Sequence, residues 1–198
     1  MDSFNILSWN VRGLKSKARR DVVRSLVSDA NASVVFLQET KLSSVSPNLI
    51  SEICGTAFSS YSFLPAYGTR GGVIVACRSP FTATVVQVLQ FSINVTVAAP
   101  TIEPFHLSAV YVPPDVRFKE PFLAELVNAR ALLPGPWLLI GDFNLISSTA
   151  DKNNANINRR SLASFRCFIS DQELKDLHLF GRSFTWSNER ASPTRQTG

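Results

Sequence analysis

The stretch WLLIGDFNLI, residues 137–146, begins as an apolar run and ends on an acid. Residues 137–140 have the composition of a buried strand, because core strands are nearly continuous runs of apolar residues. Asp142 and Asn144 follow, and side chains two residues apart in an extended chain point the same way. The stretch therefore predicts a core strand that ends on a carboxylate and an amide directed to one side.

Three other predicted strands end on groups suited to oxygen chemistry. They are residues 4–11, which contain Asn10, residues 34–37, which lead to Gln38 and Glu39, and residues 105–112, which contain Tyr111. Strand ends at one edge of a layered fold can converge on a single cleft. Two carboxylates among amides and a phenol suit Mg²⁺ or Mn²⁺, which prefer hard oxygen ligands.

Each of these residues has a structural alternative when it is taken alone. An isolated Asp at a strand end is more often a turn former or a helix cap than a catalyst. Asn10 alone fits a turn, and Tyr111 alone fits the core or the rim of a sheet. The hypothesis of a site depends on the strand ends taken together.

The rest of the chain alternates helical and strand patterns. Helical spacing covers residues 17–30, 118–133 and about 161–170, and further strands are predicted within residues 68–80, 82–91, 93–98 and 181–189. Helices and strands that intermix in this way favour a layered α/β or α+β sandwich. A chain of 198 residues without repeat or linker predicts a single domain over residues 1–198.

The composition excludes a disordered chain and argues against a disulfide framework or a zinc site. With 45% hydrophobic and 18% charged residues the chain is globular, and its net charge of +5 permits a polyanionic partner. Cys54, Cys77 and Cys167 form no CxxC pair, which predicts reduced, buried thiols of an intracellular protein. We expect no signal peptide, no transmembrane segment and no membrane partner.

Seven sequence words together resemble the exonuclease–endonuclease–phosphatase superfamily, and most closely the endonuclease domain of plant LINE-type retrotransposons. They occur in family order over nearly the whole chain: ILSWNVRGL (6–14), VVFLQETKL (34–42), GTRGGVIVA (68–76), VYVPP (110–114), LLIGDFNLI (138–146), DKNNAN (151–156) and GRSFTWSNERASPT (181–194).

The resemblance implies an α/β four-layer sandwich of two mixed β-sheets flanked by helices. It also implies a hydrolase that cleaves phosphodiesters with a divalent metal, Mg²⁺ or Mn²⁺. In the retrotransposon branch the implied partner is DNA, bound through its phosphate backbone. The nick leaves a 3′-hydroxyl that primes reverse transcription, so action on genomic DNA in the nucleus is expected.

The resemblance also implies roles for individual residues. Glu39 would hold the metal, with Asn10 helping to order that site. Tyr111 would contact the scissile phosphate. Asp142 would orient or deprotonate the attacking water, and Asn144 would hold the phosphate.

Nucleic-acid contacts are expected in two places. Arg12, Lys15 and Arg19 lie in a basic segment that could follow DNA phosphates, which would make binding salt-dependent. The alternative is a solvated helix face. Thr185 and Trp186 are implied beside the cleft near the DNA strand, the alternative for Trp186 being an aromatic residue at the edge of the core.

The family pattern continues past FTW to a further Asp motif and a Ser-Asp-His word. This sequence has no Asp after Asp176 and no His after His178, and His106 is expected on a strand face. We therefore expect a domain that is incomplete at its C-terminus, lacks its last strands and has weakened or abolished activity. The loss of one oxyanion donor alone typically costs about 10²–10³ in rate.

Two alternative functions stay open. One is a non-catalytic retroelement remnant, and the other is a phosphatase or phosphodiesterase of the same superfamily, which the words GTRGG and DKNNAN disfavour. A serine hydrolase and a P-loop protein are excluded, because the chain contains neither GxSxG nor GxxxxGK[ST].

Overall fold

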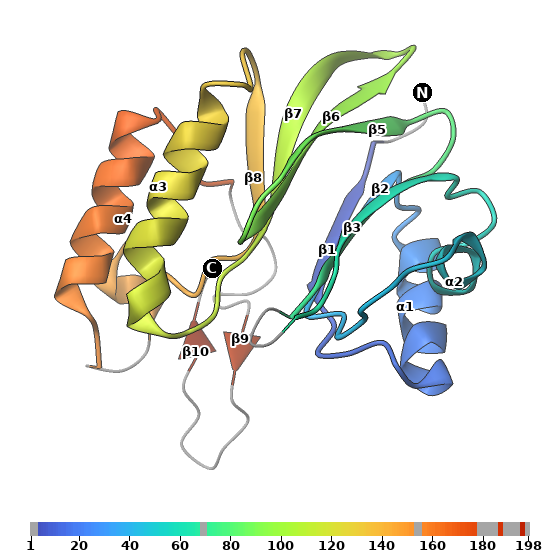
Figure 1. The fold of residues 1–198 in the computed structure, drawn as a ribbon, viewed down its shortest axis with the longest axis horizontal. Helices are drawn as coiled ribbons and strands as arrows, with labels where there is room; N and C mark the ends of the chain where they lie inside the picture. The colour runs from blue at the N-terminus through green and yellow to red at the C-terminus, as the bar shows by residue number, and fades with distance from the viewer. Residues whose placement is uncertain (1–3, 68–70, 153–155, 178–185, 188–194, 197–198) are drawn as a thin grey trace. The chain divides into compact units, whose positions relative to one another are not determined.

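The computed structural model describes residues 4–67, 71–152, 156–177, 186–187 and 195–196. The chain divides into two compact units, the first formed by Met1–Tyr111 with Ala129–Asp142 and the second by Val112–Asn128 with Phe143–Gly198. Figure 1 shows the helices and strands of each unit. A single domain over residues 1–198 stays a prediction.

The first unit contains two four-stranded sheets. The first sheet has the order β1-β2-β4-β3, and its strands are β1 (Ile6–Asn10), β2 (Val34–Gln38), β3 (Ser60–Leu64) and β4 (Val73–Cys77). The second has the order β5-β6-β7-β8, and its strands are β5 (Thr82–Val88), β6 (Ser92–Ala99), β7 (Ile102–Tyr111) and β8 (Trp137–Asp142). In each sheet one pair is parallel, β1 with β2 and β7 with β8, and the other pairs are antiparallel. The predicted α/β class, with two mixed sheets flanked by helices, is confirmed.

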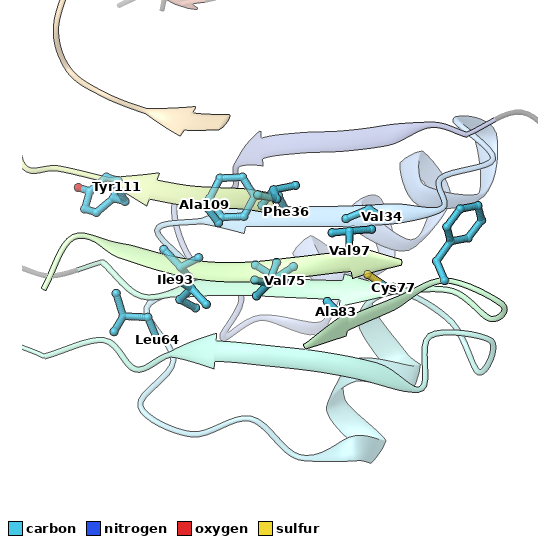
Figure 2. Packing of buried hydrophobic residues seen from close by; sticks show 14 residues of the cluster. Val34, Phe36, Leu64, Val75, Cys77, Ala83, Ile93, Val97, Ala109 and Tyr111 are labelled. Atoms are coloured by element: carbon cyan, nitrogen blue, oxygen red, sulfur yellow. The ribbon is translucent and has the colours of Figure 1, made fainter. Parts of the chain in front are cut away.

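The main core lies between these sheets. Figure 2 shows side chains of the first sheet, among them Phe36 and Val75, and of the second sheet, among them Ile93 and Ala109, in one buried cluster. Their burial follows from the alternation of side chains across a strand, which directs one set from each sheet into the space between them. Tyr111 is part of this cluster and lies at the end of its strand.

The other face of the first sheet carries two helices, α1 (Lys17–Asp29) and α2 (Pro47–Ile53). In α1, Val23 and Val27 lie one turn apart and are buried, whereas Val22 and Leu26, which share the predicted apolar spacing, stay exposed. The helix α2, like β3, is absent from the elements expected from the sequence. It begins with Pro47 in its first turn and Ser46 as the cap, whose hydroxyl accepts a hydrogen bond from the backbone of Leu49.

The strand β8 differs from its prediction. The sequence predicts a buried strand, but every residue of β8 is partly exposed. The reason is its place in the sheet: among the residues that the structure describes, β8 pairs only with β7 and is an edge strand.

The described residues of the second unit form helices, 3₁₀ turns and one short strand pair. Its elements are the 3₁₀ turns η1 (Val116–Phe118) and η2 (Thr149–Asp151), the helices α3 (Lys119–Arg130, whose last two residues belong to the first unit) and α4 (Arg159–Asp171), and the antiparallel pair β9 (Trp186–Ser187) and β10 (Arg195–Gln196). A row of aromatic rings joins α3 to α4: Phe122 contacts Phe143, Phe143 contacts Phe165, and Phe165 stacks on Phe168. Of the strand predicted over residues 181–189, only β9 lies within the described residues.

No helix in the described parts of the chain combines the length and the apolar character needed to cross a membrane.

The three cysteines are free thiols, but only two are buried. Burial raises the pKa of Cys54 and of Cys77 to about 12. Cys167 lies exposed on α4, so the prediction of three buried thiols was wrong for this residue. The helix turns residue 167 away from the aromatic row, since Phe168 takes the buried position beside it.

We expect a thiol reagent such as DTNB to label one cysteine of the folded protein quickly, at pH 8. The reactive species is the thiolate, and Cys54 and Cys77 are both covered and held protonated. Labelling should rise to three thiols per chain in guanidinium chloride. Cys167→Ser should abolish the fast phase, and a second fast thiol in that variant would contradict the burial of the other two.

Candidate active site

The candidate site is built at the carboxyl ends of the two parallel strand pairs of the first unit. Asn10 is paired with Gln38 at the end of β1 and β2, so Glu39 is the first residue beyond that pair. Tyr111 lies opposite Asp142 at the end of β7 and β8. Because the carboxyl ends of parallel strands meet at one edge of a sheet, each pair delivers its polar residues together.

A single amide group joins the two carboxylates. Asn10 Nδ2 donates hydrogen bonds to Glu39 Oε1 over 3.1 Å and to Asp142 Oδ2 over 3.0 Å. The Asn10 Oδ1 atom accepts from the backbone N–H of Arg12, which fixes the orientation of the amide. The hydroxyl of Tyr111 donates to the same Glu39 oxygen over 3.0 Å. Residues from four strand ends, distant in sequence, therefore form one hydrogen-bonded cluster.

The cluster keeps Glu39 ionised. Burial by itself raises the pKa of this carboxyl, but the hydrogen bonds from Asn10 and Tyr111 and the charge of Lys41 outweigh it, so that the pKa lies below its ordinary value. The Lys41 ammonium is 3.4 Å from Glu39 Oε2. Burial, together with the negative charge of Glu39 and the hydrogen bond to it, raises the pKa of Tyr111. The phenol therefore stays a hydrogen-bond donor at neutral pH.

The backbone around Glu39 is held in an unusual conformation. Glu39 and Lys41 both have left-handed φ values, 52° and 57°, which are uncommon for residues other than glycine. Backbone hydrogen bonds hold the segment, with Thr40 N donating to Gly72 O over 3.2 Å and Lys41 N to Gly71 O over 2.7 Å. Strained residues of this kind collect at functional sites, where surrounding contacts stabilise them.

Gly71 is required by close approach to the cluster. A Cβ atom at this position would lie 2.9 Å from Glu39 Cγ, 3.0 Å from Glu39 Cα and 3.2 Å from Tyr111 Cε1. No side chain fits there without displacing the carboxylate or the phenol. This glycine of the word GTRGGVIVA thus has a steric role beside the site.

The donor set suits a hard divalent cation. In the described residues no three His, Cys, Asp or Glu side chains form a group that could hold a metal, and the cluster offers two carboxylates, which the Asn10 amide orders by its two hydrogen bonds. Magnesium typically needs only one or two protein carboxylates and keeps several water ligands. Glu39 is ionised and partly accessible, with 22% of its side chain exposed. The residues present therefore fit such an ion.

The other predicted site residues have different environments. Asn144 belongs to the second unit, where its Nδ2 donates to Val112 O over 3.0 Å. The guanidinium of Arg19 donates to the carbonyls of Val11 and Arg12, so it supports the loop that follows β1. Arg12 is exposed on that loop. Thr185 lies outside the described residues, as does His178, and of Trp186 only its place in β9 is described.

His106 is not part of the cluster. Its Nδ1 atom lies 3.1 Å from the hydroxyl of Thr96, its cross-strand partner on β6. This is the strand-face position expected for it.

Two lysines near the predicted site residues were not identified from the sequence, because no motif or spacing pointed to them. Lys41 follows Glu39 by two residues and forms an ion pair with it, and both residues have left-handed backbone. Lys119 is only 4% exposed, and its ammonium donates to Pro113 O over 2.8 Å and to Phe143 O over 3.4 Å. These carbonyls belong to the segments that follow β7 and β8, so Lys119 fastens them to each other within the second unit.

Three solved structures share the fold of this chain. The endonuclease domain of TRAS1, a telomere-specific non-LTR retrotransposon, superposes with a TM-score of 0.70 at 15% identity, covering 99% of this chain and 82% of that one. The AP endonuclease LMAP from Leishmania major gives 0.59 at 17% identity, covering 84% of this chain and 66% of that one. The catalytic domain of APE2 from Xenopus laevis gives a TM-score of 0.51 at 19% identity, covering 86% of this chain and 68% of that one.

No curated protein matches the sequence significantly. The profile of the endonuclease/exonuclease/phosphatase family matches residues 7–197, which span both units. The chain therefore belongs to the endonuclease/exonuclease/phosphatase family.

Proposed function

We propose that this chain is a divalent-metal-dependent DNA endonuclease of the LINE retrotransposon type, which nicks one strand with Mg²⁺ or Mn²⁺ as cofactor. The observation that carries the proposal is the pair of hydrogen bonds from Asn10 to Glu39 and Asp142. The Asn10 amide holds two carboxylates from different sheets close together. Two negative charges at such a position repel each other, and packing of the core does not require them there. A divalent cation, which Glu39 would hold, would offset that repulsion and supply charge neutralisation to a phosphate.

In this proposal Glu39 holds the metal, and Asn10 orders the carboxylates around it. A divalent ion bound there would neutralise charge on the phosphate and on the leaving oxygen. Asp142 accepts the proton of the attacking water, since a carboxylate within hydrogen-bond reach of a water can act as its general base. Tyr111, held as a donor, hydrogen-bonds a phosphate oxygen.

The choice of DNA has two supports. The net charge of +5 includes Arg12, Lys15 and Arg19 near the end of β1, where they can contact a phosphate backbone. The structural neighbours include a retrotransposon endonuclease and an AP endonuclease. Action on chromosomal DNA in the nucleus follows from a retrotransposon role.

Supercoiled plasmid tests the proposal. The purified chain should convert it to open circles in Mg²⁺ or Mn²⁺ and leave it supercoiled in EDTA, and a DNA polymerase should extend from the nicks, which carry 3′-hydroxyls. Nicking that persists in EDTA would refute the metal mechanism. Release of phosphate from a small phosphate ester without any nicking would favour a phosphatase, and an inert folded chain would favour a non-catalytic remnant.

A further inference from the structure

A hollow of about 380 Å³ opens beside the carboxylate cluster in the first unit. It is lined by Lys15, Lys41, Leu42, Ser43, Ser44, Ala66 and Tyr67. The lining comes from three segments: the loop after β1, the loop after β2 and the segment after β3. The first two of these follow the strands that carry Asn10 and Glu39.

The lining combines positive charge with an exposed aromatic ring, so it suits a ligand that carries both a phosphate and a planar base. It contains two ammonium groups, two serine hydroxyls, one phenol and no carboxylate. Tyr67 is 81% exposed, which leaves most of an aromatic ring in water. Cationic grooves with aromatic side chains are the usual means of binding a nucleic-acid strand, with phosphates on the cations and bases stacked on the rings.

The walls are held in place by the backbone. Ala66 N donates to Leu42 O over 2.8 Å, which joins the segment after β3 to the loop after β2. Leu14 N donates to Thr40 O over 2.8 Å, which joins the loop after β1 to the same loop. The hollow is therefore formed in the structure as it stands.

Lys41 connects the hollow to the candidate active site. Its side chain lines the hollow, and its ammonium lies 3.4 Å from Glu39 Oε2. A strand whose phosphate reached the carboxylate cluster would thus extend past Lys41, and its next nucleotide would enter the hollow.

We propose that this hollow binds the nucleotide that adjoins the scissile phosphate of a DNA strand, with its phosphate on Lys15 and Lys41 and its base stacked on Tyr67. The inference rests on the proposed endonuclease function and adds to it a defined strand-binding subsite.

Binding in EDTA tests the subsite separately from cleavage. The probe is a set of short single-stranded DNA oligonucleotides, each carrying 2-aminopurine at one position, because the fluorescence of this base falls when it stacks. The full chain should quench one or two positions of the set more than the others. Tyr67→Ala should remove that quenching and weaken binding about tenfold, the order expected for the loss of one base–aromatic stack. Tyr67→Phe keeps the ring and should bind within about twofold of the unsubstituted chain.

Charge substitutions test the phosphate contacts. Lys15→Ala should reduce the steepness of log affinity against log salt by about 0.7, as expected for one lost phosphate contact to a single strand. Lys175→Ala makes the same charge change at an exposed residue outside the hollow and should leave the slope unchanged.

Because Tyr67 is exposed, its variants should melt at the temperature of the unsubstituted chain.

The outcomes separate the two proposals. Metal-dependent nicking with Tyr67→Ala binding DNA as well as Tyr67→Phe would overturn the subsite and leave the endonuclease function. Tyr67-dependent quenching without any nicking would support the subsite and reject catalysis. An oligoribonucleotide bound more tightly, with the same dependence on Tyr67, would overturn the assignment to DNA.

Discussion

Asp142→Asn is expected to lower the rate of plasmid nicking by about 10²–10⁴-fold, the contribution typical of a general base. The amide is nearly isosteric, and its oxygen can still accept the hydrogen bond that Asn10 donates to Asp142 Oδ2. The fold should therefore persist, and the loss should fall on the chemical step. Single-turnover nicking at saturating Mg²⁺ measures this step directly.

Glu39→Gln should behave differently from Asp142→Asn. If Glu39 holds the metal, its amide variant binds the ion more weakly, and part of the lost rate should return as the Mg²⁺ concentration rises. The Asp142→Asn rate should not recover. Asp29→Asn, the same change at an exposed acid of α1, is the matched control and should nick at the unsubstituted rate. Equal rates for Asp142→Asn and Asp29→Asn would remove the proposed mechanism.

Strand ends were the most informative part of the sequence. An apolar run that stops at a polar residue marks both the strand and its carboxyl end, and the structure has such ends at Asn10, Gln38, Tyr111 and Asp142. Side-chain hydrogen bonds then join Asn10, Glu39, Tyr111 and Asp142. Their catalytic roles stay predictions until the variants are measured.

Two elements lacked a local signal. The strand β3, Ser60–Leu64, contains two serines and is only partly buried up to its last residue, so its composition does not identify it. Pairing with β4, the next strand along the chain, forms this strand, and that pairing is not visible in the composition of β3 itself. The helix α2 has seven residues, too few for apolar periodicity to stand out.

The contacts that shape the site were also beyond sequence reasoning, because they depend on packing across the fold. The ion pair of Lys41 with Glu39 forms in a segment where both residues have left-handed backbone. The close approach of Gly71 to Glu39 and Tyr111 depends on the pairing of β2 with β4 and on the packing of the two sheets. Neither the φ values nor the packing can be obtained from the local pattern of residues.

Gly141→Ala is expected to destabilise the fold far more than any of the active-site substitutions. Gly141 lies in β8 opposite Val110 of β7 and has a φ of 142°. A Cβ atom there would lie 2.0 Å from Val110 O and 2.9 Å from Phe36 Cε1. The first contact is with backbone of the neighbouring strand, which cannot move without breaking the β7–β8 pairing. We expect a loss above about 4 kcal/mol, the range reached only by severe overpacking or strain.

The matched control is Gly135→Ala. Gly135 also has a positive φ, 92°, but a Cβ atom there would meet no atom within 4 Å. This variant should lose only the backbone strain, about 1–2 kcal/mol. Thermal unfolding followed by far-UV circular dichroism should then show a fall of a few degrees for Gly135→Ala and of about 10 °C or more, or no soluble protein, for Gly141→Ala.

The same comparison tests how the fold supports the site. The register that places Gly141 opposite Val110 also places Asp142 opposite Tyr111. If the tight contact at Gly141 holds β8 against β7, any Gly141→Ala protein that folds should nick plasmid far more slowly than Gly135→Ala, because Asp142 would no longer meet the amide of Asn10. Equal melting temperatures and equal nicking rates for the two variants would show that β8 can move away from β7 without cost, and the proposed basis for the position of Asp142 would be wrong.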